Sequence, residues 1–150
     1  MPLNFTTFWR CMNIQTVTLW SLQSRTSLRV LTDLAVNALC LIGEMLVVGL
    51  DNGPIFVFNL NSGDKIFALE GHKMAVNSLN CAESGADGAS ILFSGCTDST
   101  TRVWNLSSGE CLGELRGTHS ASVNCTTLFS SRLYTGSTDG RCGWSVRFSD

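Results

Sequence analysis

Three residues of the chain, His72, Ser94 and Asp98, have the side-chain types of a nucleophilic catalyst. In such a site the histidine would take the proton of the serine, and the aspartate would orient the histidine. The sequence contains neither the G-x-S-x-G turn that exposes a catalytic serine nor an oxyanion-hole motif. These residue types alone therefore do not establish an enzyme.

The same set occurs again further along the chain, as His119, Thr135 and Asp139. A catalytic triad has no reason to occur in tandem, whereas a structural network is repeated whenever the element that contains it is repeated. A partly buried carboxylate must be hydrogen-bonded, and histidine and backbone N–H groups can supply the donors. We therefore interpret both sets as structural and predict no catalytic residue.

The elements that position these residues are themselves repeated. An aromatic residue precedes a leucine by eleven positions in three copies, Trp20 to Leu31, Phe58 to Leu69 and Trp104 to Leu115. A Val-Asn pair stands before each full copy, at Val36-Asn37, Val76-Asn77 and Val123-Asn124. The distance from this valine to a strand-ending glycine is thirteen residues in two copies and nineteen in the middle one. The extra residues fall in Ala82 to Ser90, which is rich in Gly, Ala and Ser and predicts a longer surface loop.

The middle copy resembles a WD40 repeat. The similarity rests on Gly71-His72, on Ser94-Gly95 followed by Asp98, and on Val103-Trp104-Asn105, where Asn replaces the usual Asp. The period of roughly 40 residues and the GH…WD signature are those of one propeller blade. The similarity extends over about Met12 to Val146, nearly the whole chain.

This resemblance implies an all-β fold of WD40-type β-propeller blades, each with four antiparallel strands. We expect a half blade at 13–31, blades at 36–69 and 76–115, and an incomplete blade at 123–146. Continuous apolar runs within the strands indicate burial on both faces, as stacked blades require. Propellers close with typically 4–8 blades, so about three and a half repeats predict an open, incomplete propeller. We therefore expect a fragment or short isoform of a larger WD40 protein.

The resemblance also assigns a role to the polar sets, a hydrogen-bonded network that ties the loop before a blade to its strands. Trp144 is eight residues after Gly136, whereas Phe58 and Trp104 are nine after their glycines. The first full blade has Val48 and Phe58 at the network positions, and we expect apolar packing there. The residues of the expected network are His72, Ser94, Asp98 and Trp104, and then His119, Thr135, Asp139 and Trp144.

Composition narrows the other function classes. The 150 residues are 44% apolar and carry a formal net charge of -2, so nucleic-acid binding lacks the usual basic footprint. No two of the seven cysteines have the C-x2-C or C-x4-C spacing of a zinc-binding turn, which argues against a zinc site. Reduced thiols that act as small apolar residues are favoured instead. We expect no cofactor and no metal. Neither a signal peptide nor a membrane span is indicated, and we expect a cytoplasmic or nuclear location.

The family resemblance implies a non-enzymatic protein-protein interaction scaffold with a protein or peptide partner. Two finer alternatives follow from it, the substrate-recognition part of a ubiquitin ligase and an RNA-associated WD40 protein of a ribonucleoprotein. Partner contacts are expected in the loops before the first strands of the blades. The candidate contact residues are Asn37, Lys73, Met74, Ser120, Ala121 and Asn124.

Overall fold

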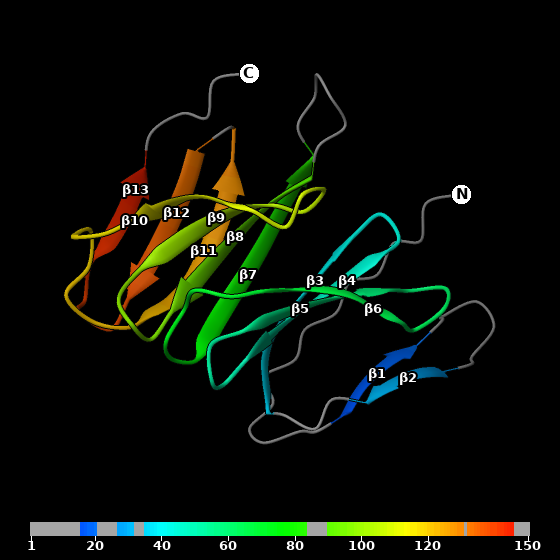
Figure 1. Cartoon of the computed structure of the whole chain (residues 1–150). Coiled ribbons are helices and arrows are strands. Elements are labelled where there is room, and N and C mark those ends of the chain that lie inside the picture. Colours follow the sequence, from blue (N-terminus) through cyan, green and yellow to red (C-terminus); the bar gives the residue numbers. More distant parts are fainter. Residues whose placement is uncertain (1–15, 21–26, 32–34, 84–89, 131, 146–150) are drawn as a thin grey trace.

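The computed structural model describes residues 16–20, 27–31, 35–83, 90–130 and 132–145, the first two segments and 144–145 by their backbone only. This part of the chain is all-β, and none of its residues forms a helix that could span a membrane. Its strands form four antiparallel sheets, none of them closed (Figure 1). A two-stranded sheet, β1 and β2, precedes two four-stranded sheets, β3–β6 and β7–β10, and a three-stranded sheet, β11–β13.

The strands of the described residues fall into four groups along the chain. The half blade contains β1 (Thr16–Trp20) and β2 (Ser27–Leu31). The first full blade contains β3 (Val36–Ile42), β4 (Met45–Leu50), β5 (Ile55–Asn59) and β6 (Lys65–Leu69). The second contains β7 (Val76–Glu83), β8 (Ser90–Cys96), β9 (Thr101–Asn105) and β10 (Cys111–Leu115). The last contains β11 (Val123–Phe129), β12 (Arg132–Ser137) and β13 (Cys142–Ser145).

Burial on both faces explains the continuous apolar strands. In β4, every residue from Leu46 to Leu50 is buried. Side chains of successive strand residues point to opposite faces, so both faces of this strand are covered. The hairpin to β5 turns at Asp51-Asn52-Gly53, and Gly53 supplies the positive φ of 113°.

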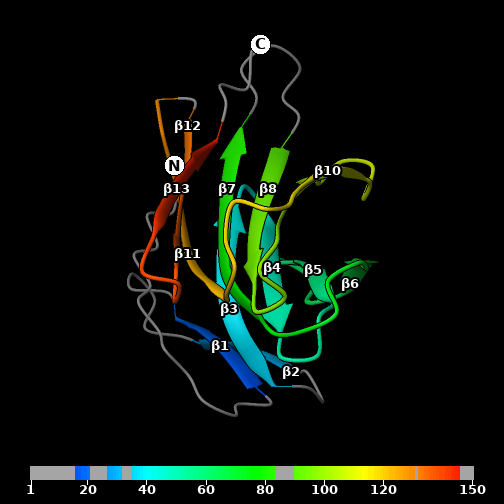
Figure 2. The same cartoon turned by 90° about the vertical axis from the view of Figure 1, so that its left-hand side faces the viewer.

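The blades stack through their first strands. β7 packs against β3 on one side and β11 on the other, so the three first strands lie side by side (Figures 1 and 2). One apolar cluster joins the first and second full blades and includes Val47 and Val57 together with Leu92 and Trp104. A smaller cluster, with Phe93 and Leu133, joins the second and third. These clusters hold neighbouring blades together by removing apolar surface from water.

The repeated valine and glycine meet at the two boundaries between the first and second full blades and between the second and last blades. A Cβ on Gly49 would lie 2.8 Å from Cγ1 of Val76, and a Cβ on Gly95 would lie 2.8 Å from Cγ1 of Val123. Only glycine leaves room for the valine of the next blade at this distance. The strand-ending glycine is therefore required by packing.

One detail differs from the sequence-based expectations. The predicted loop Ala82 to Ser90 is shorter, because Ala82 and Glu83 continue β7 and Ser90 begins β8. The pairs Ala82–Ile91 and Glu83–Ser90 extend the hairpin, so the extra residues partly lengthen the two strands. Residues 13–15 and 21–26 of the predicted half blade, 84–89 of the second full blade, and 131 and 146 of the last blade lie outside the described residues.

Candidate interaction face and its buried histidine networks

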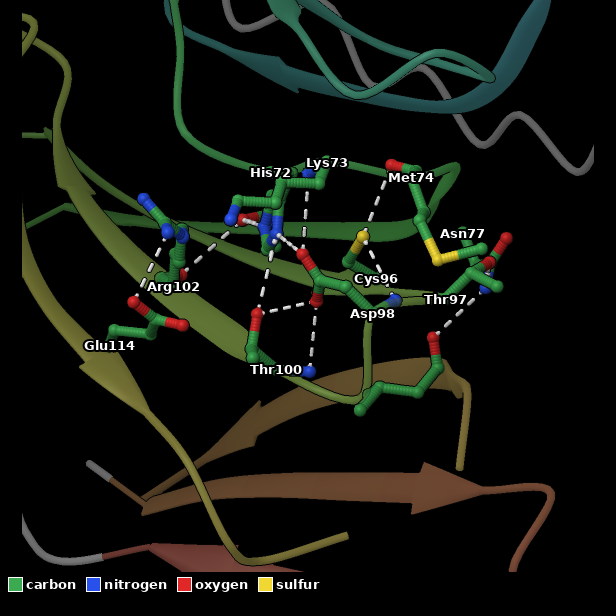
Figure 3. A network of polar contacts seen from close by, with 12 residues as sticks. His72, Lys73, Met74, Asn77, Cys96, Thr97, Asp98, Thr100, Arg102 and Glu114 are labelled. Atoms are coloured by element: carbon green, nitrogen blue, oxygen red, sulfur yellow. Dashed lines mark hydrogen bonds and ion pairs between the residues drawn. The ribbon is translucent and has the colours of Figure 1, made fainter. Parts of the chain in front are cut away.

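His72 lies in the loop between β6 and β7 and is only 6% exposed. Its Nδ1 is 3.1 Å from Oδ2 of Asp98, in the turn between β8 and β9 (Figure 3). Its Nε2 is 2.7 Å from Oγ of Ser94, in β8. The loop before the second blade is thereby tied to two places within that blade.

The distances match those of a catalytic triad, but the surroundings do not. Ser94 is 0% exposed, and Trp104 in β9 donates its indole N–H to the same hydroxyl at 2.8 Å. A nucleophile must be reached by its substrate, and this oxygen lies inside the blade behind a tryptophan that is 1% exposed. The geometry therefore supports a structural role for Ser94.

Asp98 receives hydrogen bonds on both carboxylate oxygens. Thr100 donates its hydroxyl at 2.6 Å and its N–H at 3.0 Å to Oδ1, and the N–H of Lys73 lies 3.4 Å from Oδ2. Burial by itself would raise the pKa of this carboxyl, but the hydrogen bonds from Thr100 and His72 outweigh it and hold the pKa well below its usual range. The predicted donors, histidine and backbone N–H, are present, and Thr100 adds its hydroxyl.

The protonation states follow from this arrangement. Burial lowers the pKa of His72, and the charge of Asp98 opposes that shift only in part. The neutral imidazole then donates its Nδ1–H to the Asp98 carboxylate and accepts the hydroxyl proton of Ser94 at Nε2. Each polar side-chain atom in the series of hydrogen bonds that runs from Trp104 through Ser94 and His72 to Asp98 thus has a partner, as a buried network requires.

The third blade repeats the arrangement. His119, 6% exposed, lies 3.2 Å from Oδ2 of Asp139 and 2.8 Å from Oγ1 of Thr135. The N–H groups of Ser120 and Arg141 donate to the Asp139 carboxylate at 3.0 and 2.9 Å. The Ser120 N–H in particular lowers the pKa of Asp139 to about 2.

Trp144 is the exception among the predicted network residues. In β13 it pairs with Tyr134, and Ser145 pairs with Leu133. In the second blade the tryptophan itself occupies the place opposite the corresponding leucine, since Trp104 pairs with Leu92. The spacing from glycine to tryptophan, which is one residue shorter in the last blade than in the second, therefore shifts Trp144 by one position in the sheet. The side chain of Trp144 lies outside the described part, and its place in the network stays a prediction.

The first full blade lacks the network, as its sequence indicates. Val48 and Phe58 take the places of Ser94 and Trp104 and are buried in an apolar cluster with Val36. Apolar packing thus replaces hydrogen bonding at these positions.

A second hydrogen bond ties each of these two loops to its blade, through Cys96 in the second blade and Ser137 in the last. Sequence reasoning did not identify it. The thiol of Cys96 donates to the carbonyl of Met74 at 3.1 Å (Figure 3), and the hydroxyl of Ser137 donates to the carbonyl of Ala121 at 3.2 Å. Both residues directly follow the strand-ending glycine, and this shared position was the available signal. The loops before the second and the last blade are thus each held at two places, by the buried histidine and by the residue that follows the strand-ending glycine.

His72, Cys96 and Asp98 are also the described residues that come closest to a metal-ligand set, with ligand atoms within 4.8 Å of one another. Burial raises the pKa of Cys96 to about 12, so its sulfur is a protonated thiol. Both imidazole nitrogens of His72 already have hydrogen-bond partners. A metal ion at this set would have to displace the thiol proton of Cys96 and a hydrogen-bond partner of the His72 ring.

The loop residues next to these ties face outward. Lys73 and Met74 are exposed after His72, and Ser120 is exposed after His119. Asn124 is also exposed, whereas Ala121 and Asn37 are half-buried. Asn37 donates its side-chain N–H to Asp51 at 3.1 Å.

Asn77 connects the two loop regions and was absent from the predicted contacts. Its side-chain amide lies within hydrogen-bond distance of Thr97 at 3.0 Å, Ser122 at 2.8 Å and Asn124 at 3.3 Å. The starts of β7 and β11 are therefore close together. We name the exposed residues at these two starts, Lys73, Met74, Ser120 and Asn124, the loop face.

Comparison with known proteins agrees with this geometry. The family described as WD domain, G-beta repeat matches residues 63–105. Cell division control protein 4 of Saccharomyces cerevisiae is 31% identical over 104 residues, which cover 69% of this chain and 13% of that protein. Mitochondrial division protein 1 of Mycosarcoma maydis is 35% identical over 91 residues, which cover 58% of this chain and 11% of that protein. Restriction of telomere capping protein 1 of Clavispora lusitaniae is 36% identical over 75 residues, 48% of this chain and 6% of that protein.

The chain thus spans between 6% and 13% of the length of these relatives. The matched range begins before β6 and ends with β9, and it includes the network from His72 to Trp104. Open four-stranded antiparallel sheets, stacked through their first strands, complete the agreement. The chain belongs to the WD40-repeat family and is a partial array of its repeats.

Proposed function

We propose that the chain is a non-enzymatic scaffold for protein-protein interaction and that a protein or peptide partner binds the loop face. One observation carries the proposal: the buried networks fix the backbone of the loops whose side chains are exposed. The N–H of Lys73 points to Asp98, and the N–H of Ser120 donates to Asp139. A loop that is already ordered loses less conformational entropy when it binds.

The chemistry of the loop face suggests the kind of partner. Met74 is 48% exposed, and its flexible thioether side chain adapts to apolar groups of different shapes. Lys73 next to it supplies a cationic group, and Asn124 supplies an amide. We infer a peptide segment with one apolar side chain and a neighbouring acidic residue.

Selection from a displayed peptide library against the full chain would test the proposal. For a selected peptide, we expect Met74→Glu and Lys73→Glu each to raise Kd by about tenfold, equivalent to about 1.4 kcal/mol. Leu112→Glu is the matched control, because Leu112 is 56% exposed but lies in the outer strand β10. Peptides whose affinity depends on Leu112 and ignores both loop variants would contradict the proposed face.

The finer alternatives are separate proposals. The recognition part of a ubiquitin ligase would use the same face for its substrate. An RNA-associated protein would instead show binding that weakens steeply with salt, because phosphate contacts release counterions. The net charge of -2 favours the protein partner. A location in the cytoplasm or nucleus is part of the same proposal and is supported by the free thiols of the six described cysteines.

A further inference from the structure

Cys40 in β3 and Cys81 in β7 face each other across the boundary between the first and second full blades. Their sulfur atoms lie 2.7 Å apart, although the residues are 41 positions apart in the sequence. Both side chains are half-buried and pack against the apolar cluster between these blades. A disulfide bond is about 2.05 Å long, so a small approach of the two sulfur atoms would suffice to form one.

The fold itself does not demand two thiols at these positions. At the next boundary, the strand pairing places Asn80 where the first full blade has Cys40, and Leu128 where the second has Cys81. The next boundary thus has an amide and an isobutyl group at the two matching positions. Of these two described boundaries, only the first has a thiol pair at these positions, which leaves room for a chemical role.

The pKa values of the two thiols are shifted in opposite directions. The hydrogen bond between the two thiols lowers the pKa of Cys40, whereas the same contact, together with burial, raises the pKa of Cys81. Cys40 is thus the thiol that ionises first, and the thiolate is the reactive form. Cys96 does not compete, because its buried thiol donates to the Met74 carbonyl.

We propose that Cys40 and Cys81 are a redox modification site, at which hydrogen peroxide generates a reversible disulfide between the two blades. The Cys40 thiolate attacks one peroxide oxygen, the O–O bond breaks, and the released hydroxide takes up a proton to become water. Cys40 is then a sulfenic acid. The sulfur of Cys81 attacks the sulfur of Cys40, the S–O bond breaks, and the hydroxide leaves as water with the Cys81 proton. The two thiols supply two electrons, and one peroxide becomes two waters.

This bond would join β3 to β7 covalently and prevent the first and second full blades from separating. Cellular thiols reduce such disulfides, which suits a reversible state in a reducing compartment. The site is independent of the loop face, because neither Cys40 nor Cys81 is among its residues.

Peptide mapping of the full chain tests the proposal directly. The chain is treated with one equivalent of hydrogen peroxide, alkylated, and digested without reduction. We expect a linked pair of peptides that contains Cys40 and Cys81, has lost two hydrogen atoms, and separates on reduction. The urea midpoint of the oxidised chain should exceed that of the reduced chain. In Cys81→Ser, dimedone should trap the sulfenic acid of Cys40.

Cys142→Ser is the matched control, because Cys142 is an exposed thiol outside this boundary, and the linked peptides should still form in this variant. The proposal is overturned if wild-type chain retains alkylated Cys40 and Cys81 while exposed Cys111 is oxidised. It is equally overturned if Cys40 is found linked to a different cysteine. Both results come from the unmutated chain and do not depend on the folding of any variant.

Discussion

The indole N–H of Trp104 donates to the hydroxyl of Ser94 at 2.8 Å, inside a blade that excludes water from both residues. The first full blade replaces this pair by Phe58 and Val48, which are buried in an apolar cluster. One position in the repeat thus has two solutions, a hydrogen-bonded pair and an apolar pair. A mixed pair satisfies neither, since it would leave a buried donor without an acceptor.

This relationship predicts a non-additive double-mutant cycle. Ser94→Val alone leaves the Trp104 N–H and the His72 ring without their partner, and we expect a loss of about 2–3 kcal/mol in the free energy of unfolding. Adding Trp104→Phe removes the indole N–H that Ser94→Val leaves without an acceptor. The double variant should therefore lose about 1 kcal/mol less free energy of unfolding than the two single variants lose in sum. Urea unfolding of all four proteins measures this term, and strict additivity would refute the coupling.

Removal of the carboxylate tests the network from its other end. We expect Asp98→Ala to lower the free energy of unfolding by about 1–3 kcal/mol, because His72 and Thr100 lose their buried acceptor. Asp51→Ala is the control, since Asp51 is exposed and binds only Asn37 among described side chains. Its effect should stay within about 0.5 kcal/mol. Equal stability of Asp98→Ala and the wild-type chain would contradict a structural network.

The sequence predicts the blades because their information is local. Each strand lies within one copy of the repeat, and the turns between strands contain residues such as Gly53 that favour a single geometry. The polar network could also be predicted, since His72, Ser94 and Asp98 recur at matched positions as His119, Thr135 and Asp139. The strand bounds differ from expectation mainly where β7 and β8 extend toward the long loop.

Contacts between blades could not be predicted from the repeat pattern. Cys40 and Cys81 meet because of how β3 packs on β7, and no spacing rule relates two residues that are 41 positions apart. The same holds for Asn77, whose amide reaches Ser122 and Asn124 of the next blade. The register of a strand within its blade can be counted from the sequence, whereas the register between blades depends on packing.

Acid should unfold the chain in two stages. The pKa of His72 is lowered by folding from its ordinary 6.5, so the unfolded state binds the extra proton as the pH falls below 6.5. The pKa values of Asp98 and Asp139 are also lowered, from 3.8, so their contribution is complete above pH 3.8 and is lost progressively below it. Stability should therefore be constant above about pH 7, fall gently towards pH 5, and fall steeply below pH 4.

Thermal unfolding between pH 3 and pH 8 measures this profile. In His72→Gln the fall between pH 7 and pH 5 should become smaller, while the fall below pH 4 should remain because Asp139 still loses its charge. A wild-type Tm that stays constant from pH 8 to pH 3 would show that folding perturbs the pKa of none of these three groups.

Ser99 offers a stabilising substitution. Its φ of 66° lies in the left-handed region, and the corresponding turns of the neighbouring blades have Gly53 and Gly140 there, with φ of 113° and 77°. In all three turns this residue donates its N–H to the carbonyl three positions earlier. A non-glycine residue in this conformation costs about 1–2 kcal/mol, and glycine would relieve this cost. Part of the relief is offset because glycine is more flexible in the unfolded chain. Ser99→Gly should therefore raise the free energy of unfolding by about 0.5–1 kcal/mol.

The control for this gain is Ser107→Gly, an exposed turn residue without a positive φ. It should lower stability slightly, because only the flexibility of the unfolded chain changes there. Urea unfolding of both variants separates the two effects. If Ser99→Gly were no more stable than Ser107→Gly, the left-handed conformation would not be costing the native chain free energy. If it is more stable, the turn that contains Asp98 is held in place against its own backbone preference, and the hydrogen bonds of the network supply the compensating free energy.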